Sequence, residues 1–585
     1  MLNLVFSDTL GTNITHLICK LNVSIKTGTM IILKKMRWIL LLFLSASIGI
    51  AATSASTEYF EISKNLEIFA TLYKELNSYY VDDIDPNEFM QEGIDAMLKS
   101  LDPYTNYYSE AEIENYRFET TGKYGGIGSL IKKDDDFIVI SEPYENYPAD
   151  KAGLIAGDKI VSVDGNSVKG KSSSEVSKFL KGEPGTTISV DILRPLADGS
   201  DQSLTLEITR EEVKVKNVPF YGLVQDGIGY IKLGNFTQQA SKEVKDAFKA
   251  LKKDNPELKG LVLDVRGNPG GLLHESVNIT NIFIDKSELV VFTKGKVEEW
   301  DKEFKTINEP IDTEIPLVVL TNRSSASASE IVSGAIQDLD RGVVIGQKTF
   351  GKGLVQTTRK LTYNTQLKVT TAKYYIPSGR CIQAINYAER DQDGAVKRLP
   401  DSLKVAFQTK SGRTVYDGGG IDPDILTEVE YLSDITVSLG RKDLFFDFAT
   451  LYRAKHETLH DGKDFRISAT EFDEFVAWLQ DKEYDYTTES ESLLNEFKEV
   501  AEEEEYFEAI STEFEALETK IGHDKRNDLQ KQSDEIKRLL ENEIVTRYYY
   551  REGAIENGFV YDTEVAKAVD ILNDPNEYKK ILSNQ

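Results

Sequence analysis

"IPLVVLTNRSSASASEIVSGAIQDL", residues 315–339, joins an apolar run to a helical pattern through a cluster of serines. The apolar run is short and almost uninterrupted, which predicts a strand buried on both faces of a sheet. The part that follows the serines continues as a helix. Since the carboxyl ends of such strands are where α/β proteins build their sites, this stretch predicts an α/β core and makes its serines candidate site residues.

The chain on either side repeats this alternation of strands and helices over residues 213–430, which predicts a largely parallel sheet covered by helices. Residues 117–212 differ, because short strands and tight turns follow one another there. Within them, Asp164-Gly165 is a strong hairpin signal. We therefore expect a separate β-rich module ahead of the α/β core.

Helical segments flank these two parts. Residues 56–116 have amphipathic helical spacing, and residues 431–585 are mostly helical and acidic, with 37 Asp+Glu against 19 Lys+Arg. The predicted domains are therefore a leader (1–55), an N-terminal helical segment, the β module, the α/β core and an acidic helical C-terminal domain.

Charge and rare residues exclude several classes of function. The 585-residue chain has a formal net charge of −28, which argues against nucleic acid and anionic membrane surfaces as partners. Its two cysteines, Cys19 and Cys381, cannot build a disulfide framework. The five histidines have no metal-ligand spacing. We expect no metal and no cofactor.

The N-terminal region has the pattern of a secretory signal. A basic patch precedes an apolar run and small residues within residues 34–55, and the run is short for a membrane-spanning helix. Met30 and Met36 are alternative starts that would exclude the upstream leader. We expect an exported, periplasmic protein without stable membrane insertion once the signal is cleaved. Membrane association is the alternative if the signal is retained.

The serine cluster lies where a nucleophile would find oxyanion donors. A serine between a strand and a helix has free backbone N–H groups beside it, and "LDVRGNPGG" offers glycine N–H groups at a second strand end. The core contains one histidine, His274, and it is not convincingly placed as a base. A lysine with a lowered pKa can replace histidine, and Lys352 in "TFGKGLVQ" is the candidate. On an extended segment, Gln356 would point to the same side as Lys352 and could orient it.

These residues alone leave a plainer interpretation open. "SASAS" is also typical of close helix packing, and "GKG" is typical of a turn.

Four motifs in order change that balance. "NPGGLL", "SASASEI", "TFGKGLVQ" and "GGGIDPD" follow "YGGIGSLI" and "PADKAGLIAGDKIVSVDG". In this order the chain resembles the carboxyl-terminal processing (tail-specific) serine proteases, with a PDZ domain, over residues 57–430. The resemblance implies a multidomain α+β and α/β architecture, in which a PDZ module is inserted ahead of a mixed α/β, ClpP- and crotonase-like protease core.

The resemblance also implies roles for the candidates. Ser327 would be the nucleophile and Lys352, 25 residues later, the base, with Gln356 orienting that lysine. This is a Ser-Lys dyad.

The oxyanion hole implied by the resemblance consists of the N–H of Ala328 with that of Gly270 or Gly271. Glu330 either supports this network or is simply an acid in the first turn of a helix.

The PDZ-like module implies a binding site for a substrate tail. Its loop amides at Gly126, Ile127 and Gly128 would hold a chain-terminal carboxylate, and the next strand would pair with the peptide. The family usually has histidine where Tyr104 stands.

The predicted function is a serine endopeptidase that cleaves exported proteins near their C-termini; the alternative is a non-catalytic PDZ-type adaptor. Expected partners are polypeptides with free C-termini. A homo-oligomer or an adaptor partner, docked through either helical end, stays open. The resemblance assigns no role to residues 386–416, which have the character of an insertion.

Overall fold

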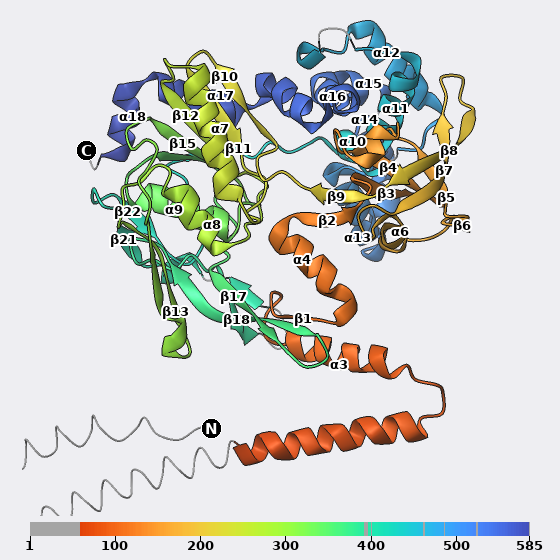
Figure 1. The fold of residues 1–585 in the computed structure, drawn as a ribbon. Helices are drawn as coiled ribbons and strands as arrows, with labels where there is room; N and C mark the ends of the chain where they lie inside the picture. The colour runs from red at the N-terminus through yellow and green to blue at the C-terminus, as the bar shows by residue number, and fades with distance from the viewer. Residues whose placement is uncertain are drawn as a thin grey trace, which may run out of the picture. The chain divides into compact units, whose positions relative to one another are not determined.

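The computed structural model describes residues 59–390, 396–398, 400–459, 462–484, 486–521 and 525–583 (Figure 1). The predicted signal, residues 34–55, lies outside these ranges. No helix within them combines the length and the apolar character needed to cross a membrane. The chain divides into two compact units, Met1–Ala96 and Met97–Gln585. The described part of the first unit contains a helix over 59–79 and the beginning of α3 (Pro86–Lys99).

The β module predicted from the turn signals is an antiparallel sheet with strand order β3-β4-β5-β7-β8, to which β6 adds by pairing with β5. Asp164 and Gly165 both have positive φ between β5 and β6, as the hairpin signal requires. Ile138, Ile160 and Val190 are fully buried in the core of this module. Its elements are β3 (Ser129–Asp134), β4 (Phe137–Pro143), α5 (Pro148–Lys151), β5 (Lys159–Val163), β6 (Asn166–Ser167), α6 (Ser173–Leu180), β7 (Thr187–Pro195) and β8 (Asp201–Thr209).

A second sheet of six strands forms the α/β core, in the order β10-β11-β12-β15-β16-β23. All neighbours run parallel except β10 and β11. This confirms the predicted fold class: a PDZ-like β module and a mixed α/β core with helical segments. The strands are β10 (Phe220–Gln225), β11 (Ile228–Lys232), β12 (Gly260–Asp264), β15 (Leu317–Thr321), β16 (Val343–Gly346) and β23 (Ile425–Leu426).

Helices cover both faces of this sheet, which explains the continuous apolar strands. Leu261 and Leu263 of β12 pack with α7, α8 and α9, whereas Val262 points to the opposite face and packs with α17 and α18. The five helices are α7 (Ala240–Asp254), α8 (Leu273–Thr280), α9 (Ala328–Asp338), α17 (Thr563–Asn573) and α18 (Pro575–Leu582).

A third sheet, β1-β18-β13-β14 with β17 paired to β18, lies next to the core and contacts α9 through β13. Because β1 pairs with β18, the turn before β1 is brought to the α/β core. The strands are β1 (Asn106–Tyr108), β13 (Leu289–Gly295), β14 (Lys302–Lys305), β17 (Leu354–Lys360) and β18 (Gln366–Tyr375). Within 386–416, β19 (Ile385–Arg390) pairs with β20 (Val396–Arg398) and β21 (Ala406–Gln408) with β22 (Thr414–Tyr416).

Two links connect the module and the core. Helix α4 (Ile113–Thr121) leads from β1 into β2 (Lys123–Gly126), which pairs with β9 (Glu211–Lys214) at the other end of the β module.

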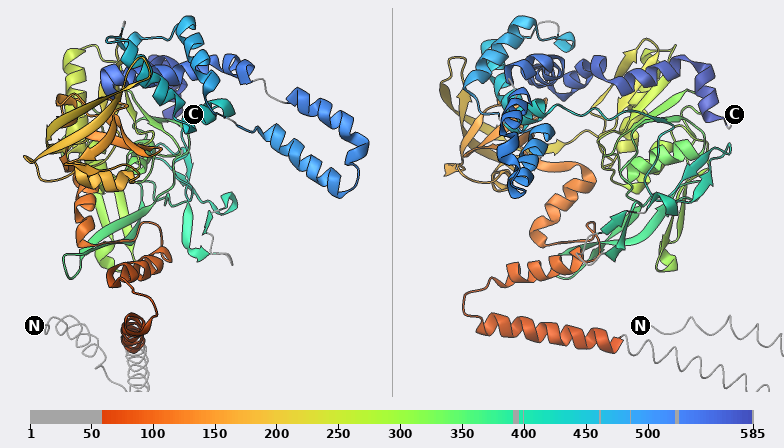
Figure 2. Two further views of the ribbon diagram at one scale, coloured as in Figure 1. Left: turned by 90° about the vertical axis from the view of Figure 1, so that its right-hand side faces the viewer. Right: turned by 180° about the vertical axis from the view of Figure 1, so that it is seen from behind.

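The segment predicted as one C-terminal domain packs in two places. Helices α10, α11, α12, α15 and α16 share an apolar core of their own. Helices α17 and α18 instead lie on the six-stranded core sheet, because Val565, Ala568 and Leu572 form an apolar face at helical spacing that buries against β12, β15 and β16. The hairpin of α13 and α14 projects from the other helices in the left view of Figure 2. The helices of this segment that precede α17 are α10 (Asp434–Arg441), α11 (Leu444–Lys455), α12 (Ala469–Trp478), α13 (Glu489–Glu503), α14 (Phe507–Ile521), α15 (Lys525–Lys531) and α16 (Ser533–Gly558).

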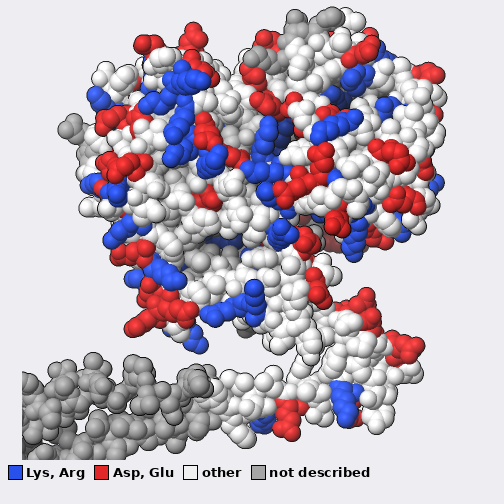
Figure 3. Space-filling model, in the orientation of Figure 1, with Lys and Arg blue, Asp and Glu red and all other residues white. Residues whose placement is uncertain are grey.

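The net negative charge does not gather in one place on the face drawn in Figure 3. Acidic and basic side chains are interspersed there.

Candidate active site

Three neighbouring parallel strands, β12, β15 and β16, bring the candidate residues together. Their carboxyl ends lie side by side, with Asp264 level with Leu320 and Thr321 level with Gly346. The glycine loop follows β12, the serine cluster follows β15, and the Lys352 loop follows β16. Motifs that lie far apart in the sequence therefore meet at one edge of the sheet because of strand order alone.

Ser327 lies at the junction between this edge and α9. Its φ of 56° is in the left-handed region, which is uncommon for a residue other than glycine. Its N–H donates to the Glu330 carboxylate at 2.7 Å, and its carbonyl oxygen accepts from the Tyr374 hydroxyl at 3.1 Å. The strained backbone is thus fixed on both sides, as is common at functional positions.

The glycine loop leaves one of its two candidate amides free. The Gly270 N–H donates to the Asn268 side chain at 2.8 Å, so it is already used. Within the part of the chain that the structure describes, the N–H groups of Gly271 and Ala328 have no hydrogen-bond partner. A Cβ on Gly270 would come within 2.8 Å of both the Ala328 nitrogen and the Ser327 Cβ, so only glycine fits against the serine. Gly271 is therefore the better partner for Ala328.

Lys352 lies in the loop between β16 and β17. Its Nζ is 4.1 Å from the centroid of the Tyr104 ring, and among the described residues it forms no hydrogen bond or ion pair. Burial, and after it the charge of Lys368, lowers the pKa of Lys352 to about 8. About a tenth of the amine is therefore neutral at pH 7, far more than for an unperturbed lysine, and a general base needs this neutral form.

Glu330 holds the serine and lysine backbones together. The same carboxylate oxygen, Oε2, accepts from the N–H of Ser327 at 2.7 Å and from the N–H of Lys352 at 2.9 Å. The other oxygen accepts from the Gly351 N–H at 2.7 Å and the Thr349 hydroxyl at 2.5 Å. Burial raises the pKa of Glu330 to about 7, although these hydrogen bonds favour its charged form. Glu330 lies in the first turn of α9 and its carboxylate contacts the backbones of both candidate residues, so its supporting role stays a prediction.

Gln356 shares the cavity with Lys352, but the hydrogen bond of its side chain goes elsewhere. Its Nε2 donates to the Thr370 hydroxyl at 3.3 Å. The expectation that it points to Lys352 assumed regular strand alternation. The pairing of β17 with β18 shifts between Val355 and Gln356, where Thr371 of the facing strand β18 is the extra residue of a bulge.

Two tyrosines that the sequence analysis did not assign to the site border it. The buried Tyr374 hydroxyl contacts the carbonyl oxygens of both Ser327 and Lys352. The Tyr104 ring lies against the Lys352 amine and is held by the turn before β1, where Asp102 accepts from the N–H groups of Tyr104 and Thr105, each at 2.8 Å. The motif "LDPYTNYYS" was the available signal for Tyr104; nothing in the sequence distinguishes Tyr374 from other core aromatics.

A cavity of ≈ 520 Å³ opens onto these residues. It has room for an extended peptide segment, and its walls combine apolar residues such as Leu272 and Leu273 with polar ones such as Glu119 and Asn235. Its lining includes Phe118, Gly270, Gly271, Leu272, Leu273, Ser327, Ala328, Ile331, Lys352, Leu354, Gln356, Lys368 and Tyr374. Among the described residues, no group of His, Cys, Asp or Glu is arranged to bind a metal ion.

The PDZ loop lies at the entry to an edge strand. Gly126 ends β2, and Ile127 and Gly128 lead into β3, which is the outer strand of its sheet. The Ile127 side chain is buried in the module core, and Gly128 has a φ of 74° with Tyr147 packed against it. The open edge of β3 leaves room for an added peptide strand.

Three parts of the chain match the profiles of known protein families. Residues 227–391 match the profile of Peptidase family S41, residues 139–194 that of the PDZ domain, and residues 435–572 that of the C-terminal helical domain of probable PDZ-proteases.

Individual relatives agree. The carboxy-terminal-processing protease of Bartonella bacilliformis is 38% identical over 346 residues, 59% of this chain and 78% of that protein. A probable CtpA-like serine protease of Staphylococcus aureus is 36% identical over 365 residues, 62% of this chain and 70% of that protein. Among solved structures, the photosystem II D1 C-terminal processing protease is 29% identical, with a TM-score of 0.33 over 62% of this chain and 93% of that one. The chain belongs to the carboxy-terminal-processing proteases of peptidase family S41, and it is a serine-type peptidase with a PDZ domain.

Proposed function

We propose that Ser327 and Lys352 form a catalytic dyad that cleaves polypeptides near their C-termini. The observation that carries this proposal is the Glu330 oxygen that accepts from the N–H groups of both residues, because it holds nucleophile and base against a single atom. The lowered pKa of Lys352 supports the role of base.

In this mechanism, neutral Lys352 takes the hydroxyl proton as Ser327 attacks the scissile carbonyl. The N–H groups of Ala328 and Gly271 stabilise the oxyanion, each worth about 3 kcal/mol in the barrier. Lys352 then protonates the leaving amine, and water hydrolyses the acyl-enzyme. The non-catalytic adaptor alternative is set aside because the chain is a serine-type peptidase.

The PDZ module binds the tail in this proposal. The terminal carboxylate lies on the amides of Gly126, Ile127 and Gly128, and the peptide adds to the edge of β3. The substrates are exported proteins, in keeping with the secretory pattern at residues 34–55.

The direct test compares wild type with Ser327→Ala and Lys352→Ala on an unstructured peptide substrate. Both variants should lose kcat by at least about 10³-fold and still bind the peptide. Normal turnover by folded Lys352→Ala would refute the dyad. A matched peptide with an amidated C-terminus tests the tail site: its KM should rise about tenfold because one charge-assisted carboxylate contact is lost.

A further inference from the structure

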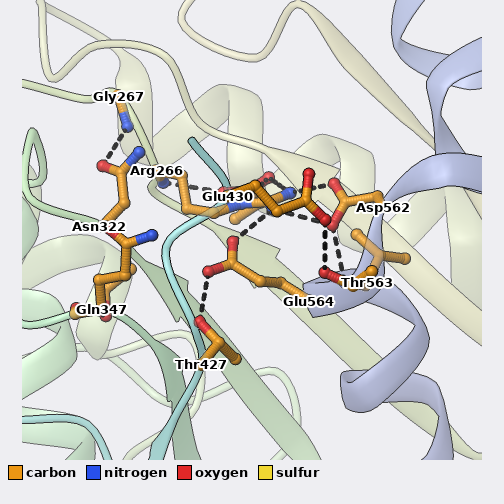
Figure 4. Close-up of polar contacts among 12 residues, drawn as sticks. Arg266, Gly267, Asn322, Gln347, Thr427, Glu430, Asp562, Thr563 and Glu564 are labelled. Carbon is orange, nitrogen blue, oxygen red and sulfur yellow. Dashed lines mark hydrogen bonds and ion pairs between the residues drawn. The ribbon is translucent and has the colours of Figure 1, made fainter. Parts of the chain in front are cut away.

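Arg266 is the residue that joins the glycine loop to the C-terminal part of the chain (Figure 4). Its guanidinium is bound by three carboxylates. Nη1 lies 2.9 Å from Asp562 Oδ1 and 2.7 Å from Glu564 Oε2, and Nη2 lies 2.7 Å from Asp562 Oδ2. Asp264, fully buried at the end of β12, accepts from the remaining N–H groups of Arg266.

Asp562 and Glu564 lie at the N-terminus of α17, which holds them in place. Asp562 caps α17 by accepting from the Val565 N–H at 2.9 Å, and Glu564 accepts from the Thr427 hydroxyl at 2.6 Å. Helix α17 is in turn fixed by its apolar face, which is buried against the protease sheet. Asp562 and Glu564 therefore cannot follow Arg266 if it moves.

The glycine loop, which carries the proposed oxyanion donor, begins at the next residue, Gly267. The Gly267 N–H donates to the Asn322 side chain at 2.9 Å, and the Asn268 carbonyl accepts from the Ala326 N–H at 3.0 Å. Gly271 follows with its free amide. The loop is thus attached to the serine segment at its first two residues, and Arg266, which the carboxylates hold, directly precedes them. An arginine is always charged, so it must keep carboxylate partners in this half-buried position.

We propose that Asp562 and Glu564 are positioning residues for catalysis, which act through Arg266 to hold the loop 267–271 with the Gly271 amide aimed at the reacting carbonyl. This inference rests on the proposed oxyanion hole. It gives the final helices of the chain a role in turnover, separate from any partner that helices α10 to α16 bind. Misplacement of an oxyanion donor by a fraction of a bond length lowers the rate of acylation and leaves peptide binding unaffected.

The test uses the full chain and the variants Asp562→Asn, Glu564→Gln and their combination. Asparagine and glutamine keep the shape of the acids that they replace, and an asparagine in the capping position can still cap α17. The double variant should lose kcat about tenfold or more while KM stays within about twofold, and its acylation by a serine-directed fluorophosphonate should slow in parallel.

The matched control is Glu430→Gln. Glu430 lies beside these residues (Figure 4). It binds Arg538 at 2.9 Å and accepts from the Thr563 hydroxyl, but among the described residues no hydrogen bond or ion pair joins it to Arg266. Its kcat should equal that of wild type. If the double variant does not fold, the folded single variants are compared in its place.

The proposal is overturned if the folded variants keep wild-type kcat and acylation rate, or if Glu430→Gln loses as much activity as they do. Neither result would affect the dyad, which Lys352→Ala tests independently. If Lys352→Ala keeps normal turnover while Asp562→Asn still lowers kcat, the base is a residue other than Lys352 that acts beside the same loop.

Discussion

Ser327, the proposed nucleophile, and Lys352, the proposed base, are held in opposite ways. Ser327 has its N–H and its carbonyl hydrogen-bonded, next to a glycine loop that is itself attached to the serine segment. Lys352 has a fixed backbone, but its amine lies on an aromatic ring with no hydrogen-bond partner among the described residues. Fixing by hydrogen bonds defines a direction of attack, whereas an amine without acceptors stays less basic. The comparison indicates that hydrogen bonds fix the position of Ser327, whereas burial without hydrogen-bond partners keeps the pKa of the Lys352 amine low.

The strongest way to break this comparison is Lys352→Arg. Arginine keeps the positive charge and much of the shape, but its pKa is too high for a neutral form to exist. Activity should fall at least about 10³-fold, as far as in Lys352→Ala. Appreciable kcat in Lys352→Arg, measured on the same peptide, would mean that a positive charge rather than a base is needed.

Glu330→Gln tests the hydrogen-bonded side. Whichever way the glutamine amide is turned, its nitrogen faces at least one backbone N–H, which then loses its acceptor. We expect kcat to fall about 10²-fold and the free energy of unfolding to fall by about 1–3 kcal/mol. Glu275→Gln is the matched control, because Glu275 is a buried carboxylate on α8 that accepts from the N–H groups of Gln239 and Ser241. It should lose stability but keep kcat. Equal losses of kcat in both variants would reduce Glu330 to a stabilising role.

Much of this arrangement could be predicted from the sequence, and the reason is physical. Ser327, Ala328 and the glycines follow apolar strand patterns, and strand ends in a parallel sheet share an edge. The hydrogen bond from Gln356 to Thr370 could not be predicted, because the residue pattern does not show how the facing strand β18 bulges at Thr371. The ion pair between Arg266 and Asp562 could not be predicted either, because no local sequence pattern links residues that lie 296 positions apart. Nor did helix periodicity show that α17 packs on the protease sheet rather than on α16.

Lys352→Met should stabilise the fold. The pKa of Lys352 falls from 10.5 to about 8 on folding, so below pH 8 the folded state contains a disfavoured ammonium group. Removing it should raise the free energy of unfolding by about 2 kcal/mol. The gain should be largest below pH 8 and disappear as the pH approaches 10.5, where the amine is neutral in both states. Denaturant unfolding at about pH 7 and about pH 10 measures this; a gain independent of pH would indicate better packing instead.

The smallest expected effect concerns Tyr104. Its ring face stabilises the ammonium form by about 0.5–1 kcal/mol. Tyr104→Leu keeps the site dry but removes this attraction, so the lower limb of the pH profile of kcat/KM should move down by about half a pH unit. Tyr104→Phe keeps the ring and should leave the limb in place. A limb that moves equally in both variants would assign the effect to the hydroxyl and its contact with Tyr387.

The central claim is that the neutral amine at position 352 takes the proton from Ser327. The most direct measurement is the pH dependence of Ser327 acylation in wild type and in a chemically modified Lys352→Cys variant. Alkylation converts the new cysteine to the thioether analogue of lysine, whose amine is less basic. Identically treated wild type is the control for alkylation of Cys381. We predict a rise in rate centred near pH 8 for wild type, in line with the lowered pKa of Lys352, and a rise at lower pH for the analogue. An unchanged profile after this replacement would contradict the assignment of the base.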